Sequence, residues 1–173
     1  MKWALMVIGT LAAIVTIVWI IGALLPREHV ATRMARYAQS PEAIWQAITD
    51  AEAMPSWRKD VKSVKRLPEE NGMPGWIETM SMGEVPLRVE DSEAPRRLVM
   101  RIASGALPFG GTWSYELTPA SGGGATLRIT EDGFVEPALF RFMARFIFGH
   151  TATLEQYVKD LGAKFGEDVT PQP

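Results

Sequence analysis

The stretch FRFMARFIFGHTATLEQYVKDLGAKFG, Phe140–Gly166, decides the fold that this sequence predicts. Its apolar side chains recur at spacings of three and four, as on one face of an α-helix. This stripe consists of Phe140, Met143, Ile147, Thr151, Leu154, Val158, Leu161 and Phe165. In the first half it is widened by Leu139, Phe142, Phe146 and His150. The pattern predicts a long amphipathic helix whose amino-terminal half carries more apolar surface than packing on a sheet requires.

A second apolar segment lies at the other end of the chain. The run WALMVIGTLAAIVTIVWIIGALL, Trp3–Leu25, has 23 residues and no charge. As a helix it would be about 35 Å long, enough to cross a hydrocarbon core of roughly 30 Å. A signal peptide has a shorter apolar region and a small-residue cleavage site, which the following LLPREH lacks. We therefore expect residues 1–27 to be an uncleaved anchor that contacts the membrane through residues 3–25.

The side of the membrane is a separate question, on which two signals disagree. The basic residues Arg27, Arg33 and Arg36 after the span favour a cytoplasmic domain. The very short leader, with Lys2 and the amino terminus, favours the opposite orientation. Our prediction is a single-pass protein with its domain on the extracytoplasmic side.

Composition excludes several classes of function. The chain is 47% hydrophobic with a net charge of −2, whereas a nucleic-acid-binding protein usually carries a basic surplus. It has no cysteine, so disulfides and cysteine-ligated zinc are excluded. The two histidines, His29 and His150, are far apart in sequence and belong to no ligand-spaced motif. We predict no nucleic-acid partner, no metal site and no cofactor. The motifs GxSxG and HExxH are also absent, which disfavours a hydrolase.

Short helices and strands fill the region between the two apolar segments. Ser40 can cap a helix over SPEAIWQAITD with Pro41 at its first position, and AEAMPSWRKDV predicts a second short helix or turn. Seven strands are expected, over Val30–Ala38, Val61–Leu67, Gly75–Met82, Val85–Asp91, Arg97–Ala103, Thr112–Thr118 and Ala125–Thr130. The last residues, 167–173, read as a disordered tail. Sequential antiparallel strands with a helix laid across them make an α+β fold.

Four segments carry a family resemblance: SPEAIWQAITDAEAMPSW, PFGGTWSYELTP, GGGATLRITEDG and the final helix. Together they resemble the START-like helix-grip superfamily (SRPBCC), in its polyketide cyclase/dehydrase branch. The resemblance covers residues 28–166, which we expect to form the domain. It implies a curved antiparallel sheet of about seven strands around the C-terminal helix, with a cavity between them for an apolar ligand.

Strand alternation and the helical stripe nominate residues for that cavity. Buried Trp and Tyr side chains need partners for their polar atoms, so they are candidate ligand donors as well as core residues, and Met adapts to varied apolar shapes. The predicted ligand-binding residues are Trp57, Trp76, Met80, Met100, Trp113, Tyr115, Phe142, Met143, Phe146 and Ile147.

Two ionisable residues are candidates for acid–base chemistry. Glu78 shares a strand face with Trp76 and Met80. It is a catalytic acid in the cavity, an exposed residue near the strand end, or the partner of one of the chain's arginines. His150 lies in the apolar arc of the last helix, where a core histidine and a catalytic base are both open. Arg58, Lys59 and Lys62 are expected on a solvated basic face.

These observations favour a membrane-tethered domain that binds a lipid-like or other hydrophobic small molecule. One alternative is a cyclase or dehydratase that uses the same cavity. Another is a protein-interaction domain whose cavity is filled by side chains. Leu139, Phe142 and Phe146 are expected at the cavity entrance or on the membrane surface, unless loops such as Pro55–Trp57 cover them.

Overall fold

The computed structural model describes residues 2–103 and 105–173. The chain begins with the long helix α1 (Lys2–Leu24), followed by strand β1 (Glu28–Tyr37), helix α2 (Pro41–Thr49) and the 3₁₀ turn η1 (Ala51–Ser56). Six strands come next: β2 (Val61–Glu70), β3 (Met73–Met80), β4 (Gly83–Glu93), β5 (Arg97–Ile102), β6 (Phe109–Pro119) and β7 (Ala125–Val135). The chain then forms helix α3 (Ala138–Met143), the π-helical turn η2 (Ala144–Phe148) and helix α4 (Ala152–Lys164).

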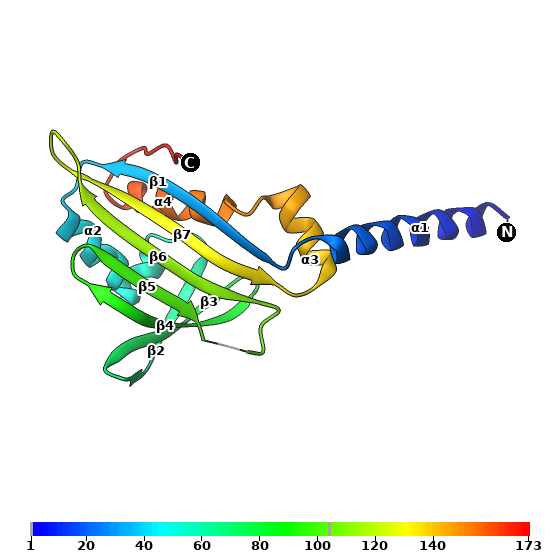
Figure 1. The fold of residues 1–173 in the computed structure, drawn as a ribbon, viewed down its shortest axis with the longest axis horizontal. Helices are drawn as coiled ribbons and strands as arrows, with labels where there is room; N and C mark the ends of the chain where they lie inside the picture. Colours follow the sequence, from blue (N-terminus) through cyan, green and yellow to red (C-terminus); the bar gives the residue numbers. More distant parts are fainter. Residues whose placement is uncertain (1, 104) are drawn as a thin grey trace.

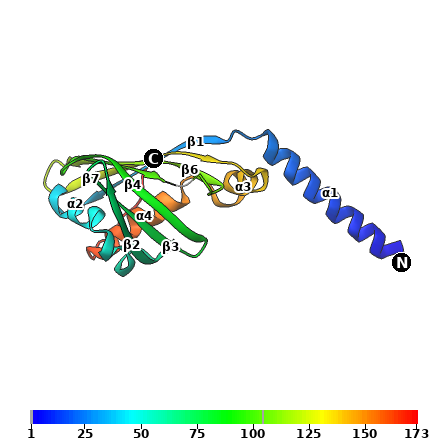
Figure 2. The same ribbon diagram turned by 90° about the horizontal axis from the view of Figure 1, so that it is seen from below.

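The seven strands form one antiparallel sheet in the order β1-β7-β6-β5-β4-β3-β2. The first strand therefore pairs with the last, and the five hairpins in between run in sequence. Asn71 and Gly72 close the β2–β3 hairpin with positive φ values of 54° and 75°, as a tight two-residue turn requires. The sheet curves around α4, with α2 beside it (Figures 1 and 2). The predicted α+β helix-grip fold, with two short helices after the first strand, is confirmed.

The hydrophobic core lies between the sheet and α4. The predicted stripe of the last helix supplies Leu154, Val158 and Leu161, which are fully buried. Leu127 and Ile129 of β7 are also fully buried. The phenol of Tyr37, on the neighbouring strand β1, donates a hydrogen bond to the Val158 carbonyl at 2.9 Å. A satisfied buried hydroxyl thus fixes α4 against the edge of the sheet.

The C-terminal helix is not continuous, although its apolar stripe is. The π-helical turn η2 ends at Gly149, whose φ of 77° is left-handed and stops the helix. As a result α4 packs against β1 of the sheet, while α3 packs mainly against α1. Side-chain periodicity could not reveal this division, because Ile147, Thr151 and Leu154 keep the helical spacing of four and three across the break.

The C-terminal tail is packed, in contrast to the predicted disorder of residues 167–173. Gln172 exchanges two backbone hydrogen bonds with Met34 of β1, at 2.9 and 2.8 Å. Val169 is buried, and the Glu167 carboxylate accepts a hydrogen bond from the Ala38 amide at 2.8 Å. The tail therefore covers part of the edge that β1 would otherwise expose.

Helix α1 extends away from the domain as a single rod (Figures 1 and 2). Its 23 residues are long enough and apolar enough to cross a membrane, as an anchor or as a signal sequence would. Gly22 is its one buried residue. The helix therefore meets the domain only through its C-terminal end.

Candidate ligand cavity

A cavity of about 570 Å³ lies between the sheet and the C-terminal helical segments. Strands β3 to β7 form one wall, while α3, η2 and the start of α4 form the other. Most of its lining is apolar, including Val85, Leu87, Met100, Ile102, Trp113, Phe140, Met143 and Phe148. A volume of this size matches the pockets that hold small organic ligands in other proteins.

Seven of the residues nominated from the sequence line this cavity: Met80, Met100, Trp113, Tyr115, Met143, Glu78 and His150. They come from β3, β5, β6 and the C-terminal helical region, so the helix-grip arrangement brings them together. Strand alternation correctly placed the inward faces of β3 and β6.

Five nominated residues do not line the cavity. Trp57 and Trp76 are buried beside it in the core, where Trp76 donates its indole N–H to Glu78 at 3.1 Å. Phe142 is half-buried and packs on Phe146, with ring centroids 4.9 Å apart. Phe146 and Ile147 are 58% and 62% exposed. The π-helical turn explains the last two errors, since its wider winding rotates side chains away from positions that a 3.6-residue period predicts.

A buried ion pair lines the mostly apolar cavity. One terminal nitrogen of Arg58 donates to both carboxylate oxygens of Glu78, at 2.9 and 2.8 Å. The other end of the guanidinium bonds to Asp60 at 2.7 Å, and its carbon lies 5.2 Å from the ring centre of Tyr157. Burial by itself lowers the pKa of Arg58, but the charge of Glu78 and the bond to Asp60 outweigh it and raise that pKa.

The sequence analysis missed Arg58 and placed it on a solvated face. It is 7% exposed, and Glu78 is 2% exposed. One signal could have found it, because a carboxylate on the inward face of a strand requires a cationic or hydrogen-bonding partner. Arg58 also follows Trp57, a residue with reason to be buried. The arginine-partner interpretation of Glu78 is therefore the one that the structure supports.

An aromatic cluster surrounds this ion pair. Tyr157 contacts Trp57, Trp113 and Tyr115 with ring centroids 5.4 to 6.0 Å apart. Burial raises the pKa of both Tyr115 and Tyr157, so both phenols stay protonated at neutral pH. The Trp57 indole N–H is buried without a hydrogen-bond partner among the described residues. This end of the fold therefore offers an unused donor beside a charged pair.

The two histidines meet on the cavity wall. The rings of His29 and His150 stack with centroids 4.2 Å apart, and His29 Nε2 lies 3.7 Å from a Glu131 carboxylate oxygen. Burial lowers the pKa of His150, and the neighbouring His29 lowers it further. Residues 2–103 and 105–173 contain no group of three side chains placed to hold a metal ion. Sequence distance hid this contact, which the pairing of β1 with β7 and the break at Gly149 create.

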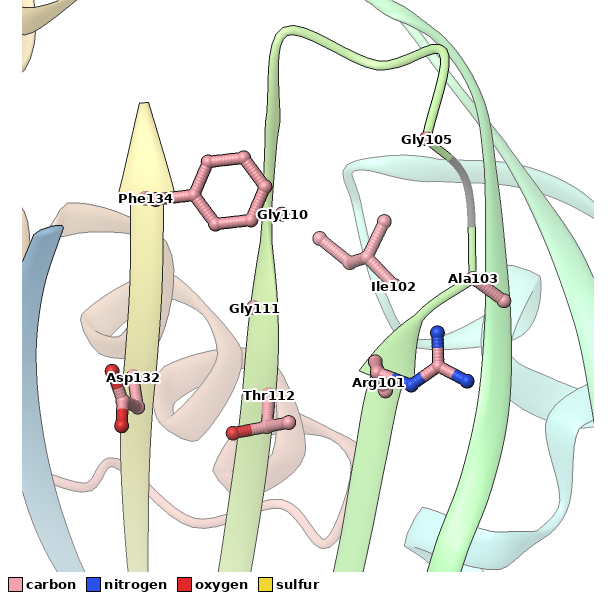
Figure 3. Close-up of a pocket in the computed structure, with 9 residues that line it drawn as sticks. All are labelled: Arg101, Ile102, Ala103, Gly105, Gly110, Gly111, Thr112, Asp132 and Phe134. Atoms are coloured by element: carbon pink, nitrogen blue, oxygen red, sulfur yellow. The ribbon is translucent and has the colours of Figure 1, made fainter. Parts of the chain in front are cut away.

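Gly110 and Gly111 leave the sheet without side chains at the point where β5 and β6 stop pairing. Pairing between these strands ends at Arg101 and Thr112. Beyond that point Gly110 lies beside the ring of Phe134, where an added Cβ would come within 2.6 Å of the ring (Figure 3). Ile102, Gly110, Gly111 and Phe134 line both the cavity and a second depression. The aromatic ring thus covers a stretch of sheet that has no side chains of its own.

The fold is similar to several solved structures. A START superfamily protein from Mycobacterium smegmatis aligns with a TM-score of 0.62 at 19% identity, covering 80% of this chain and 97% of that one. Norcoclaurine synthase from Thalictrum flavum aligns with a TM-score of 0.63 at 12% identity, covering 86% and 91%. The di-domain ARO/CYC StfQ of steffimycin biosynthesis aligns with a TM-score of 0.63 at 13% identity. That match covers 79% of this chain and half of StfQ.

At these identities the likeness shows the fold alone. No curated protein matches the sequence. The family model described as "Polyketide cyclase / dehydrase and lipid transport" matches residues 29–160, which is most of the chain. The match spans every strand, both short helices and most of α4. The chain therefore belongs to the polyketide cyclase/dehydrase and lipid transport family.

Proposed function

We propose that this protein is a membrane-anchored binding domain for an amphipathic, lipid-like small molecule. The cavity carries the proposal. Its volume of about 570 Å³, its mostly apolar lining and its position between sheet and helix suit a hydrophobic ligand. A cavity of this size also argues against an interaction domain filled by its own side chains.

The ligand is expected to carry one polar group. A wholly apolar molecule would leave the Arg58–Glu78 pair facing hydrocarbon, which costs free energy. A hydroxyl, carbonyl or carboxyl group could instead bond to the charged pair. The methionines Met80, Met100 and Met143 would adapt to the shape of the remaining hydrocarbon.

The anchor is the second part of the proposal. Helix α1 fits the dimensions of a membrane span, and Arg27 and His29 follow it almost directly. The domain would then lie within about 10 Å of the bilayer, since extended chain spans roughly 3.3 Å per residue. Carbonate extraction of membranes, with amino-terminal sequencing of the protein, tests this part. A soluble mature form that begins near residue 27 would refute it.

Extraction of bound molecules tests the binding function. The full chain is purified in detergent, and native mass spectrometry and organic extraction identify molecules that accompany it. Met143→Trp is the cavity variant, because the larger ring occupies space between α3 and the sheet. Lys65→Trp is its control, since Lys65 is exposed on β2 and does not line the cavity. We expect a bound apolar molecule in the unmodified protein and the control, and its loss in Met143→Trp. Equal occupancy in all three proteins contradicts the proposal.

A cyclase-type enzyme remains the second candidate. The observation that favours it is the presence of Tyr115 and His150 on the walls of one cavity, since such groups can transfer or hold protons. A bound molecule that is recovered chemically altered after incubation, and unaltered with Tyr115→Phe, would support this candidate over simple binding.

A further inference from the structure

The C-terminal end of α1 is built into the folded domain. An added Cβ on Gly22 would lie 2.0 Å from the backbone oxygen of Ala138 in α3. The two helices can approach this closely only because Gly22 has no side chain. Small residues serve this purpose at helix contacts within membranes.

Arg141 completes the joint between the two helices. Its Nε donates to the Gly22 carbonyl at 2.8 Å, and a terminal nitrogen lies 3.5 Å from the Ala23 carbonyl. Its other terminal nitrogen donates to the Glu136 carbonyl at 2.5 Å. The last carbonyls of a helix lack partners within the helix. A cation at this end is also stabilised by the negative end of the helix dipole. Arg141 is buried, so these bonds replace water that the site excludes.

The connection that follows α1 is also fixed. The Val135 amide donates to the Arg27 carbonyl at 2.9 Å, and an Arg27 guanidinium nitrogen lies 3.2 Å from a Glu136 carboxylate oxygen. Strand β1 begins at Glu28, one residue later. Helix α1 is therefore not a loosely tethered leader. Removing it would leave the buried Arg141 without two of its acceptors.

An exposed apolar surface lies on α3 and η2, beside this joint. Its members are large, exposed side chains: Leu139, Phe140, Phe146, Ile147 and Phe148. Arg145 is exposed on the same turn and could contact anionic headgroups. We call these side chains the α3–η2 surface. Helix α3, which carries Leu139 and Phe140, lies next to the C-terminal end of α1 (Figures 1 and 2).

We infer that the α3–η2 surface inserts into the lipid bilayer beside α1, so that the cavity opens toward the membrane. This inference rests on the proposed anchor. The occupant of the surface follows from its continuity with α1, because lipid that surrounds the end of that helix also reaches the helix packed against it. Phe140, Met143 and Phe148 belong to this segment and also line the cavity. A lipid-like ligand can thus pass between bilayer and cavity without crossing water.

Site-specific fluorescence in vesicles tests the insertion. The chain has no cysteine, so a single introduced cysteine takes an environment-sensitive label. Ile147→Cys places the label on the α3–η2 surface. Thr118→Cys is the control, because Thr118 is exposed on β6. It lies at the end of the sheet where β1 finishes at Tyr37, whereas α1 joins the opposite end of β1. Each full-length protein is reconstituted into vesicles of phosphatidylcholine and phosphatidylglycerol that contain nitroxide-labelled lipid.

We expect lipid nitroxides to quench the Ile147 label several-fold more than the Thr118 label, and an aqueous quencher to show the reverse order. Equal quenching at both positions, with the protein in the vesicle fraction, overturns the insertion but leaves the anchor intact. Recovery of the protein outside the vesicle fraction overturns the anchor and the insertion together.

A pair of glycine variants tests the joint. Gly22→Ala introduces the Cβ that collides with Ala138, whereas Gly9→Ala places one where nothing lies within 4 Å. Both changes raise helix propensity equally. We expect lipid quenching of the Ile147 label to fall toward the control level in Gly22→Ala and to be unchanged in Gly9→Ala. Unchanged quenching in both variants would show that the joint does not position the surface.

Discussion

Arg58 holds both carboxylate oxygens of Glu78 through a single nitrogen, at 2.9 and 2.8 Å, against the wall of an apolar cavity. The two residues come from different parts of the fold, since Arg58 follows the turn η1 and Glu78 lies on β3. Trp76 adds a third hydrogen bond to the same carboxylate. The pair is thus a fixed polar feature of the cavity and not a free acid.

Removing one member of this pair should destabilise the protein strongly. Glu78→Ala leaves the Arg58 guanidinium buried beside the cavity with Asp60 as its remaining carboxylate, and losing one partner of a buried pair costs about 3–5 kcal/mol. The double variant Arg58→Met, Glu78→Met should lose less than Glu78→Ala, because it leaves no buried charge from the pair. Denaturant unfolding in detergent measures both. A cost below about 1 kcal/mol for Glu78→Ala would show that water or relaxation replaces the bond.

Stability should fall as the pH drops below about 6.5, in part because of His150. Burial and His29 lower the pKa of His150 below its ordinary value of 6.5, while Glu131 opposes the shift and Arg145 adds to it. Between the two pKa values the unfolded chain binds more protons, so unfolding becomes more favourable as the pH falls. Above about pH 6.5 this contribution is complete and constant.

The variant His150→Gln should show a smaller loss of thermal stability between neutral and mildly acidic pH. The same change in thermal stability with pH is measured for His29→Gln, as a comparison. This variant removes the ring that stacks on His150 and the contact with Glu131. An unchanged pH dependence in His150→Gln would assign the titration to other groups.

The C-terminal tail should contribute to stability. Truncation after Asp168 removes buried Val169 and the two backbone hydrogen bonds between Gln172 and Met34. Burial of a valine and two net hydrogen bonds together suggest a loss of roughly 2.5–6 kcal/mol. Truncation after Thr170 separates the two contributions, because it retains Val169. Thermal unfolding of the truncated proteins that equals that of the full chain would show that the tail only rests on β1.

Much of the fold could be predicted because its signals are local. Alternation along β3 and β6 placed Glu78, Met80, Trp113 and Tyr115 inward, and the stripe of Leu154, Val158 and Leu161 placed α4 on the sheet. Each of these signals depends on the geometry of a single strand or helix. In β3, β6 and α4 the side chains keep the usual repeat of a β-strand or an α-helix.

The site was harder to predict because it depends on contacts between distant elements. Arg58 looked like part of an exposed basic group with Lys59 and Lys62, and only the folded chain brings it to Glu78. His29 and His150 meet because β1 pairs with β7 and the helix breaks at Gly149. Phe146 and Ile147 were misplaced because a π-helical turn does not keep the period of the helix around it.

The last prediction separates exposed from buried apolar residues in the C-terminal helical region. Phe146 is mostly exposed, so Phe146→Ser should change the free energy of unfolding in detergent by no more than about 0.5 kcal/mol. Leu154→Ala is the comparison variant: Leu154 lies on the apolar stripe that Phe146 widens, but it is fully buried, and its truncation should cost about 2–5 kcal/mol. Denaturant unfolding in detergent compares the two variants directly. A loss of several kcal/mol in Phe146→Ser would place this side chain in the core, which is the outcome expected if the apolar excess only serves packing. A small loss leaves the exposed phenylalanine without a role in folding, as expected of a side chain that faces lipid.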